Sequence, residues 1–189
     1  PGTVFNRYPP SDTSLPARYA RAIGRFFQGG SGALEASLNM IDDLIKENPS
    51  NPYFWEVKGD VLMRSGKMKE AAPNLRHALK LAPDSTLIRV QLATALQNGN
   101  DAAASAEAVE LLRKSLVTDL NPHAFRMLAT AYYKQGKGPE ADAMIAQAYF
   151  LEGDIKQSQI FAKRAQPKLR PGSPEWIKND DIINFRPQT

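Results

Sequence analysis

Two histidines are the side chains best suited to catalysis or metal binding in this sequence of 189 residues, which contains no cysteine. His77 and His123 lie far apart in the sequence, and neither belongs to an H-E-x-x-H motif that would place two imidazoles on one face of a helix. Without thiolates, the usual four ligands of a structural zinc site are not present either. We therefore expect no metal site and no cofactor, and we interpret His77 as a packing or surface residue.

Paired carboxylates and a glycine-rich segment are the other chemical candidates. Asp42–Asp43 and Asp180–Asp181 are adjacent pairs, and adjacent residues on a helix point in different directions, so neither pair predicts an acid/base couple. The segment GGSG at residues 29–32 lacks the preceding strand and the following Lys-Ser/Thr of a phosphate loop, which indicates a turn. The sequence predicts no catalytic residue in this chain.

The spacing of small residues indicates a helical repeat instead. Gly59, Ala71 and Ala78 fall at positions 8, 20 and 27 of a 34-residue unit, and Pro83 ends its second helix. These are the positions at which the helices of a tetratricopeptide repeat (TPR) hairpin approach most closely. A later unit repeats the pattern, with Ala129 at position 8. Small side chains at these positions would let neighbouring helices pack tightly.

The repeats predict an all-α fold of about ten helices, arranged as antiparallel hairpins in a TPR-like right-handed superhelix. Asn51-Pro52, Asn121-Pro122 and Ser173-Pro174 each read as a helix cap followed by proline at the first helical position. We expect a Pro-rich extended linker at residues 1–14 and a TPR domain at 15–184, with four to five hairpins and a C-terminal capping helix. A frayed tail is expected at 185–189, and no apolar run is long enough to span a membrane. The chain begins at Pro1, which suggests a processed protein or a piece of a longer one.

The first helix of each TPR hairpin is expected to line a concave groove. That groove is acidic at one end and basic with aromatic residues at the other, which suits a protein or peptide segment, although a solvated wall is the alternative for any single residue. Lys at position 5 and Asn at position 9, which grip a C-terminal carboxylate in chaperone-binding TPR domains, are both absent. The expected binding residues are Tyr53, Glu56, Asp60, Arg64, His123, Arg126, Thr130, Tyr133 and Lys134.

The net charge of +4 comes from 24 basic and 20 acidic residues that are mostly interleaved. Because nucleic-acid binders concentrate Lys and Arg on one face, no nucleic-acid partner is expected. Lys163, Arg164, Lys168 and Arg170 are the exception, since no acid lies near them in the sequence. They mark either the cationic end of a helix or a second candidate for the recognition surface.

Several segments outside the repeat consensus resemble one family. The segments FNRYP, DTSLPARYARAIGRFFQG and LEGDIKQSQIFAKRAQPKLRPGSPEWIKNDDI are similar to the C-terminal TPR region of BepA-like periplasmic zinc metalloproteases. The resemblance covers residues 5–183. It implies an upstream H-E-x-x-H protease domain, a periplasmic location and a role in outer-membrane protein quality control.

In that family the TPR region would recruit substrates or barrel-assembly components, and it would contact the parent protease domain. No part of the family's zinc motif occurs here, so this chain by itself is expected to be inert as a protease. The alternative is a free-standing TPR adaptor with no enzyme attached.

Overall fold

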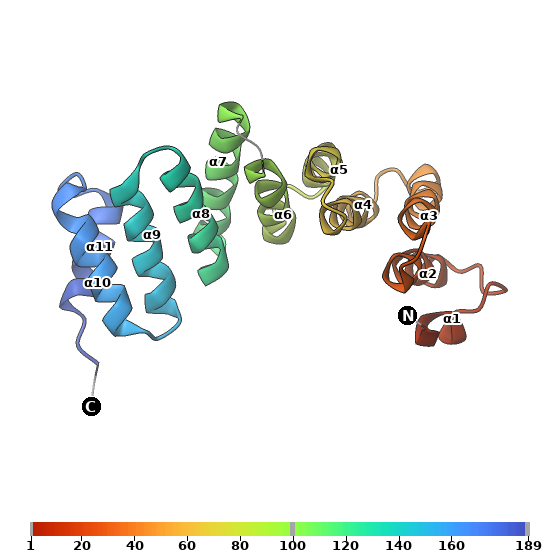
Figure 1. The fold of residues 1–189 in the computed structure, drawn as a ribbon, viewed down its shortest axis with the longest axis horizontal. Helices are drawn as coiled ribbons and strands as arrows, with labels where there is room; N and C mark the ends of the chain where they lie inside the picture. The colour runs from red at the N-terminus through yellow and green to blue at the C-terminus, as the bar shows by residue number, and fades with distance from the viewer. Residues whose placement is uncertain (1, 99–100, 188–189) are drawn as a thin grey trace. The chain divides into compact units, whose positions relative to one another are not determined.

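The computed structural model describes residues 2–98 and 101–187. Within these ranges the chain is entirely helical, with eleven α-helices, one short 3-10 helix and no strand (Figure 1). The all-α prediction is therefore confirmed. The chain divides into two compact units, one up to Ala95 and one from Leu96 onward, and the handedness of the array stays a prediction.

The first unit contains two antiparallel hairpins, α2–α3 and α4–α5, which follow a short N-terminal helix. Helix α6 begins in this unit and ends at the start of the second one. The helices are α1 (Gly2–Arg7), α2 (Leu15–Gln28), α3 (Ala33–Glu47), α4 (Pro52–Arg64), α5 (Met68–Leu81) and α6 (Thr86–Gln97).

The second unit is built around the hairpin α8–α9. Helix α7 packs on α8, α10 packs on α9, and α11 packs on both α9 and α10. The helices are α7 (Ala102–Thr118), α8 (Pro122–Lys134), α9 (Gly138–Leu151), α10 (Ile155–Ala165), the 3-10 helix η1 (Gln166–Lys168) and α11 (Pro174–Asn184).

Side-chain caps begin the helices at the predicted positions. The Oδ1 atom of Asn51 accepts a hydrogen bond from the backbone N–H of Tyr53 at 3.0 Å, and Asn121 does the same for His123 at 2.8 Å. Ser173 accepts from the N–H of Trp176 at 3.2 Å. Each cap satisfies an N–H group that has no partner within its helix, which fixes where the helix starts.

The small residues of the repeat mark the close helix contacts. A Cβ atom placed on Gly59 would lie 2.5 Å from Cγ of Leu75, so α4 approaches α5 too closely for a side chain there. Ala71, Ala78 and Ala129 are all fully buried. The predicted role of positions 8, 20 and 27 is therefore confirmed.

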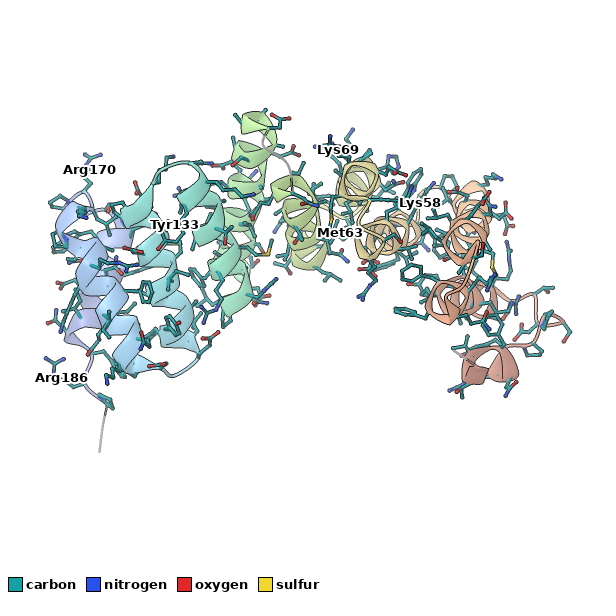
Figure 2. The ribbon with its side chains drawn as sticks, viewed as in Figure 1. Lys58, Met63, Lys69, Tyr133, Arg170 and Arg186 are labelled. Carbon is teal, nitrogen blue, oxygen red and sulfur yellow. The ribbon has the colours of Figure 1, made fainter. Side chains whose placement is uncertain are left out.

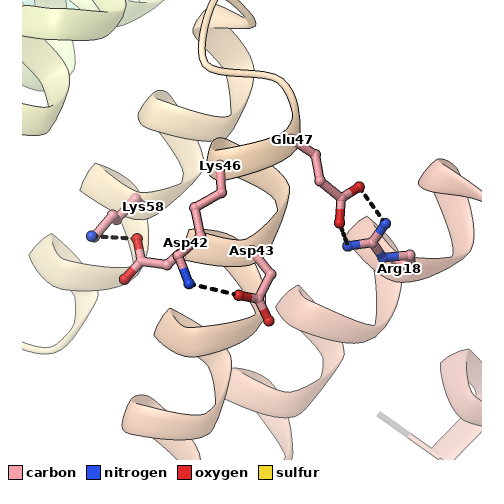
Figure 3. A network of polar contacts seen from close by, with 6 residues as sticks. All are labelled: Arg18, Asp42, Asp43, Lys46, Glu47 and Lys58. Carbon is pink, nitrogen blue, oxygen red and sulfur yellow. Dashed lines mark hydrogen bonds and ion pairs between the residues drawn. The ribbon is translucent and has the colours of Figure 1, made fainter.

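Ion pairs link consecutive helices of the first unit (Figure 3). Arg18 of α2 pairs with Glu47 of α3 at 2.6 Å, and Lys58 of α4 pairs with Asp42 of α3 at 2.5 Å. The neighbouring Asp43 pairs with Lys46 on its own helix instead. The two adjacent acids thus point in different directions, as expected for helix neighbours.

The N-terminal segment corrects one expectation. An extended linker was predicted at residues 1–14, but Gly2–Arg7 forms α1, which packs on α2. The contact is close, since a Cβ on Gly24 would lie 3.1 Å from Cγ1 of Val4. Arg21 then fixes the chain after α1 by donating to the carbonyl oxygen of Pro9 at 2.8 Å. The segment GTVFNR contains no proline, so nothing in it prevents a helix.

The C-terminal segment is also more ordered than a frayed tail. The side-chain N–H of Gln159 donates to the carbonyl oxygen of Phe185 at 3.0 Å, and the ring of Phe185 meets that of Phe150 edge to face at 5.0 Å. These contacts tie the end of α11 to α9 and α10. Residues 188 and 189 of the predicted tail lie outside the described residues.

Candidate protein-binding surface

The predicted residues of the first unit lie on α4 and include one large exposed aromatic side chain. Tyr53 is 64% exposed. Glu56 is half-buried and accepts a hydrogen bond from the side-chain amide of Gln91 at 2.6 Å. Asp60 pairs with Arg64 one turn later at 2.7 Å. This surface therefore presents an aromatic ring, a half-buried acid and an internal ion pair.

Burial changes the acidity of this surface. It raises the pKa of Glu56 above its ordinary value of 4.5, the hydrogen bond from Gln91 opposes that rise, and the nearby charge of Asp60 adds to it. Desolvation favours the neutral form of a carboxyl group, and a like charge acts in the same direction. Glu56 is therefore a carboxyl group whose ionisation opposes folding.

Arg126 of α8 is held by two neighbours in the second unit. Its Nη2 atom lies 2.5 Å from the carboxylate of Glu152 at the end of α9. Its guanidinium also lies over the ring of Tyr149, 4.6 Å from the centroid. Both contacts fix the orientation of the planar group, which still has further N–H donors for a partner.

Tyr133 of α8, labelled in Figure 2, belongs to a cluster that the sequence did not reveal. Its hydroxyl donates to the carboxylate of Asp142 on α9, while its ring is 48% exposed. Arg164 of α10 donates to the same carboxylate, with Nε 2.5 Å from Oδ2. The guanidinium of Arg164 also lies 4.5 Å from the ring centroid of Phe161 and 3.4 Å from the hydroxyl of Tyr133.

Arg164 has no acid near it in the sequence, but the fold brings one to it. Asp142 stands 22 residues earlier in the chain and meets Arg164 only because α9 packs against α10. The sequence did carry one signal, since Asp142 is an acid within the otherwise apolar run ADAMIA. A buried acid in such a run implies a partner, because an unpaired buried charge is costly.

The ionisation states in this cluster follow from its geometry. Burial alone would raise the pKa of Asp142, but hydrogen bonds from Arg164 and Tyr133 outweigh it and hold the pKa below its ordinary value of 3.8. Burial, together with the hydrogen bond to Asp142, raises the pKa of Tyr133. At neutral pH the carboxylate is therefore charged, and it balances the charge of Arg164.

This cluster joins the two surfaces that the sequence left as alternatives. Arg164 follows Thr130 by one repeat of 34 residues and contacts Tyr133 directly. The start of the predicted basic segment therefore belongs to the same surface as the predicted groove residues of α8. The other residues of the basic segment, Lys163, Lys168 and Arg170, are exposed and lie within six residues of Arg164 in the sequence.

Two of the three remaining predicted residues of α8 use their side chains to bond backbone carbonyl oxygens of the domain itself. Thr130 donates its hydroxyl to the carbonyl oxygen of Arg126 at 3.0 Å, and Lys134 donates to the carbonyl oxygen of Gln97 at 2.6 Å. The side chain of His123 is exposed at the start of the helix. Of the predicted residues in this unit, Arg126 and Tyr133 therefore offer a partner the most contact area.

The other predicted chemistry fits a non-catalytic surface. His77 is exposed, and its ring packs on Trp55 with centroids 4.2 Å apart, in agreement with its interpretation as a packing or surface residue. Within the described ranges, no three His, Cys, Asp or Glu side chains come together as a group that could hold a metal ion. No described helix is both long enough and apolar enough to cross a membrane.

Antiparallel hairpins with small residues at positions 8, 20 and 27, and with charged and aromatic side chains on their first helices, define a TPR-type protein-interaction domain. The chain belongs to the family described as the cytochrome c-type biogenesis protein H TPR domain, whose family model matches residues 34–153.

Comparisons with known proteins agree with this class. The chain is 25% identical over 171 residues to the "Beta-barrel assembly-enhancing protease" of Yersinia pestis. The match covers 90% of this chain and 34% of that protein, so the chain spans about a third of the length of this relative. It resembles the TPR region of that protease, as the sequence segments predicted.

Solved structures of MamA share the fold. "MamA 41-end from Desulfovibrio magneticus RS-1" matches with a TM-score of 0.64 and 16% identity, over 87% of this chain and 89% of that one. "MamA MSR-1 C2" matches with a TM-score of 0.65 and 20% identity, over 80% and 84% of the two chains. These likenesses show a common helical-repeat architecture.

Proposed function

We propose that this domain recruits protein segments to a periplasmic zinc metalloprotease that acts in outer-membrane protein quality control. The similarity to the beta-barrel assembly-enhancing protease over nine-tenths of the chain carries the proposal. The partners would be substrates or components of the barrel-assembly machinery, and the domain itself supplies no catalytic group. The alternative is an adaptor without an attached enzyme, and the family match, which concerns the TPR hairpins alone, is compatible with both.

The recruiting surface in the second unit combines Arg126 and Tyr133 of α8 with Arg164 of α10. Aromatic and Arg side chains provide large contact area with few rotatable bonds, which is why they dominate protein interfaces. Ile160, one repeat after Arg126 and 49% exposed, adds an apolar contact on α10. An extended segment bearing carbonyl or carboxylate acceptors and one apolar side chain would satisfy these groups.

The first unit carries a candidate surface of its own, which is richer in acidic acceptors. Tyr53 provides the aromatic contact there, Glu56 and Asp60 provide acceptors, and Arg64 is already paired with Asp60. A basic or amide-rich segment fits this surface better than an acidic one. Each unit would therefore select segments of a different charge.

Arg126→Glu tests the proposal with the domain as bait in a pull-down from a periplasmic extract of the bacterium that makes it. The wild-type domain should capture outer-membrane barrel proteins or barrel-assembly components, and capture should fall about tenfold in the variant, the size of effect expected at a binding hot spot. Helicity should be retained and the melting temperature should fall only slightly, because Arg126 is partly exposed and its pair with Glu152 is a surface ion pair.

A matched charge reversal identifies the surface. The double variant Lys163→Glu/Lys168→Glu alters the basic segment without touching α8 and should retain most of the capture. Full capture by Arg126→Glu combined with loss in the double variant would move recognition to the basic segment. Failure of the wild-type domain to capture any envelope protein would refute recruitment itself.

A further inference from the structure

The second unit contains a hollow of about 520 Å³ that is separate from the proposed recruiting surface. It is bounded by α7, α8, α9 and the first turns of α11. Its apolar walls are formed by Val117, Leu120, Phe125, Leu128 and Met144. The volume falls within the range of natural ligand sites.

Different sides of α8 face the hollow and the recruiting surface. Phe125 and Leu128, at positions 4 and 7 of the repeat, line the hollow, whereas Arg126 and Tyr133 belong to the recruiting surface. Successive residues on an α-helix are rotated by about 100°, so these sets point in different directions. A partner in the hollow would not cover Arg126.

The outer wall of the hollow exposes apolar side chains at a cost. Val117 at the end of α7 is 83% exposed, and Leu120 in the following loop is 59% exposed. The floor residues Phe125, Leu128 and Met144 are buried. A partner that covered Val117 and Leu120 would remove contiguous apolar surface from water, which is the main driving force of association.

The hairpin fold does not require this apolar character. Two repeats earlier, in α4–α5, Lys58 and Asn74 stand at the repeat positions of Leu128 and Met144, and they line a hollow among α3, α4 and α5. There the charge of Lys58 is paired with Asp42. The same positions are thus polar in one hairpin and apolar in the other, so the shared hairpin framework does not by itself dictate an apolar hollow.

The rim of this hollow is positively charged. Arg113 lies 3.6 Å from the carboxylate of Glu175 and donates to the hydroxyl of Tyr132 at 3.2 Å, so it is already engaged. Lys114 and Lys178 also line the hollow, and both are exposed. Among the side chains that line it, three cations face one carboxylate. Two positive charges therefore remain for a partner to balance.

We propose that this hollow binds a segment of a partner protein in which large apolar side chains are flanked by carboxylates. The apolar side chains would lie against Val117, Leu120 and Leu128, and the carboxylates would pair with Lys114 and Lys178. The proposal is independent of the recruiting surface on α8 and α10, and its test uses variants that leave Arg126 and Tyr133 unchanged.

Short random peptides displayed on phage provide the probe. They are selected on the intact domain, and the enriched sequences are made as fluorescent peptides for anisotropy titrations. The selected peptides should carry Leu, Ile or Phe next to Asp or Glu. Their binding should weaken as salt rises, because the exposed lysine–carboxylate pairs are screened.

Two matched pairs of variants locate the binding. Val117→Glu should weaken binding of the selected peptides at least tenfold, whereas Leu87→Glu, which makes an exposed apolar residue acidic in the first unit, should leave their binding unchanged. Lys114→Glu/Lys178→Glu should weaken them at least tenfold at low salt, whereas Lys156→Glu/Lys163→Glu should not. All four changed sets lie on exposed positions, so melting temperatures should stay near wild type.

Three outcomes would overturn the proposal. Selected peptides without carboxylates would contradict the charge complementarity, and equal binding by Val117→Glu would place the peptides elsewhere. Sedimentation showing that the domain self-associates and that Val117→Glu abolishes it would make a second copy the occupant. Any of these results leaves the Arg126→Glu test of recruitment unaffected, so the two proposals can fail separately.

Discussion

The hairpins α4–α5 and α8–α9 share their framework but present different chemistry to a partner. Pro52 and Pro122 begin the first helices, and Leu81 and Leu151 end the second ones, so every residue has its counterpart 70 positions along. Both hairpins start at an Asn cap. Their turns place Gly66 and its counterpart at φ angles of 75° and 72°, a conformation that favours glycine.

The differences between the hairpins lie away from this framework. Glu56 in α4 corresponds to Arg126 in α8, and the polar Lys58 corresponds to the buried Leu128. Caps, turns and small contact residues thus define the hairpin, while the other positions are free to change charge and polarity. We therefore expect partner selection to depend on the exposed residues among those other positions.

Giving one hairpin the residue that the other has at the same position should produce the largest change in the free energy of unfolding. Leu128 is 2% exposed, so Leu128→Lys would bury an ammonium group and remove apolar packing, and the free energy of unfolding should fall by about 3–5 kcal/mol. The reverse change, Lys58→Leu, loses a partly exposed ion pair with Asp42 and should cost no more than about 1 kcal/mol. Urea unfolding of both variants measures the contrast. Equal losses would contradict the difference in burial between the two positions.

Changes at the shared small positions should be costly in both hairpins. Ala78→Leu and Ala129→Leu should each reduce the free energy of unfolding by about 1–3 kcal/mol, because both alanines are fully buried at helix contacts. Gly59→Ala should also destabilise, although alanine favours helices, since its Cβ would clash with the buried Leu75. Thermal melts provide the test. Wild-type melting of both leucine variants would mean that the repeat register is wrong.

A fall in pH should change the contributions of Glu56 and Asp142 to stability in opposite directions. The pKa of Glu56 is raised, so the stability linked to its protonated form is complete below pH 4.5 and is lost as pH rises through that raised pKa. The pKa of Asp142 is lowered, so its contribution is present above pH 3.8 and is lost as pH falls through the lowered pKa. Glu56→Gln should therefore be more stable than wild type near pH 7, and Asp142→Asn less stable by about 1 kcal/mol, a value reduced because Arg164 is half exposed.

Unfolding free energies measured from pH 7 down to pH 3 check this contrast. The difference between wild type and Glu56→Gln should shrink first as the pH falls toward 4.5. The difference for Asp142→Asn should persist and shrink only below pH 3.8. Parallel pH profiles for the two variants would contradict the assigned directions.

Sequence reasoning predicts the framework because its signals are local or periodic. Asn51, Asn121 and Ser173 stand beside the N–H groups they cap, and Gly59 and Ala78 recur at a fixed spacing. Such features need no knowledge of long-range packing. The hairpins and their contact positions could therefore be predicted closely.

Features that depend on packing between distant helices were missed. The pairing of Asp142 with Arg164 requires α9 and α10 to lie side by side, and the hollow beside Val117 requires α11 to pack on α9. Helix α1 was missed because nearby prolines suggested an extended chain. The nine residues predicted for binding remain a hypothesis that the Arg126→Glu experiment begins to test.

Helix α1 has a consequence for how these molecules behave in concentrated solution. In a helical repeat array each hairpin covers an apolar face of its neighbour, and the first hairpin, α2–α3, would otherwise leave such a face open. Val4 and Phe5 of α1 pack against α2 at Gly24 and cover part of that face. A face of this kind, if uncovered, would be available to another molecule. We therefore expect Val4 and Phe5 to oppose association of this domain through its first hairpin.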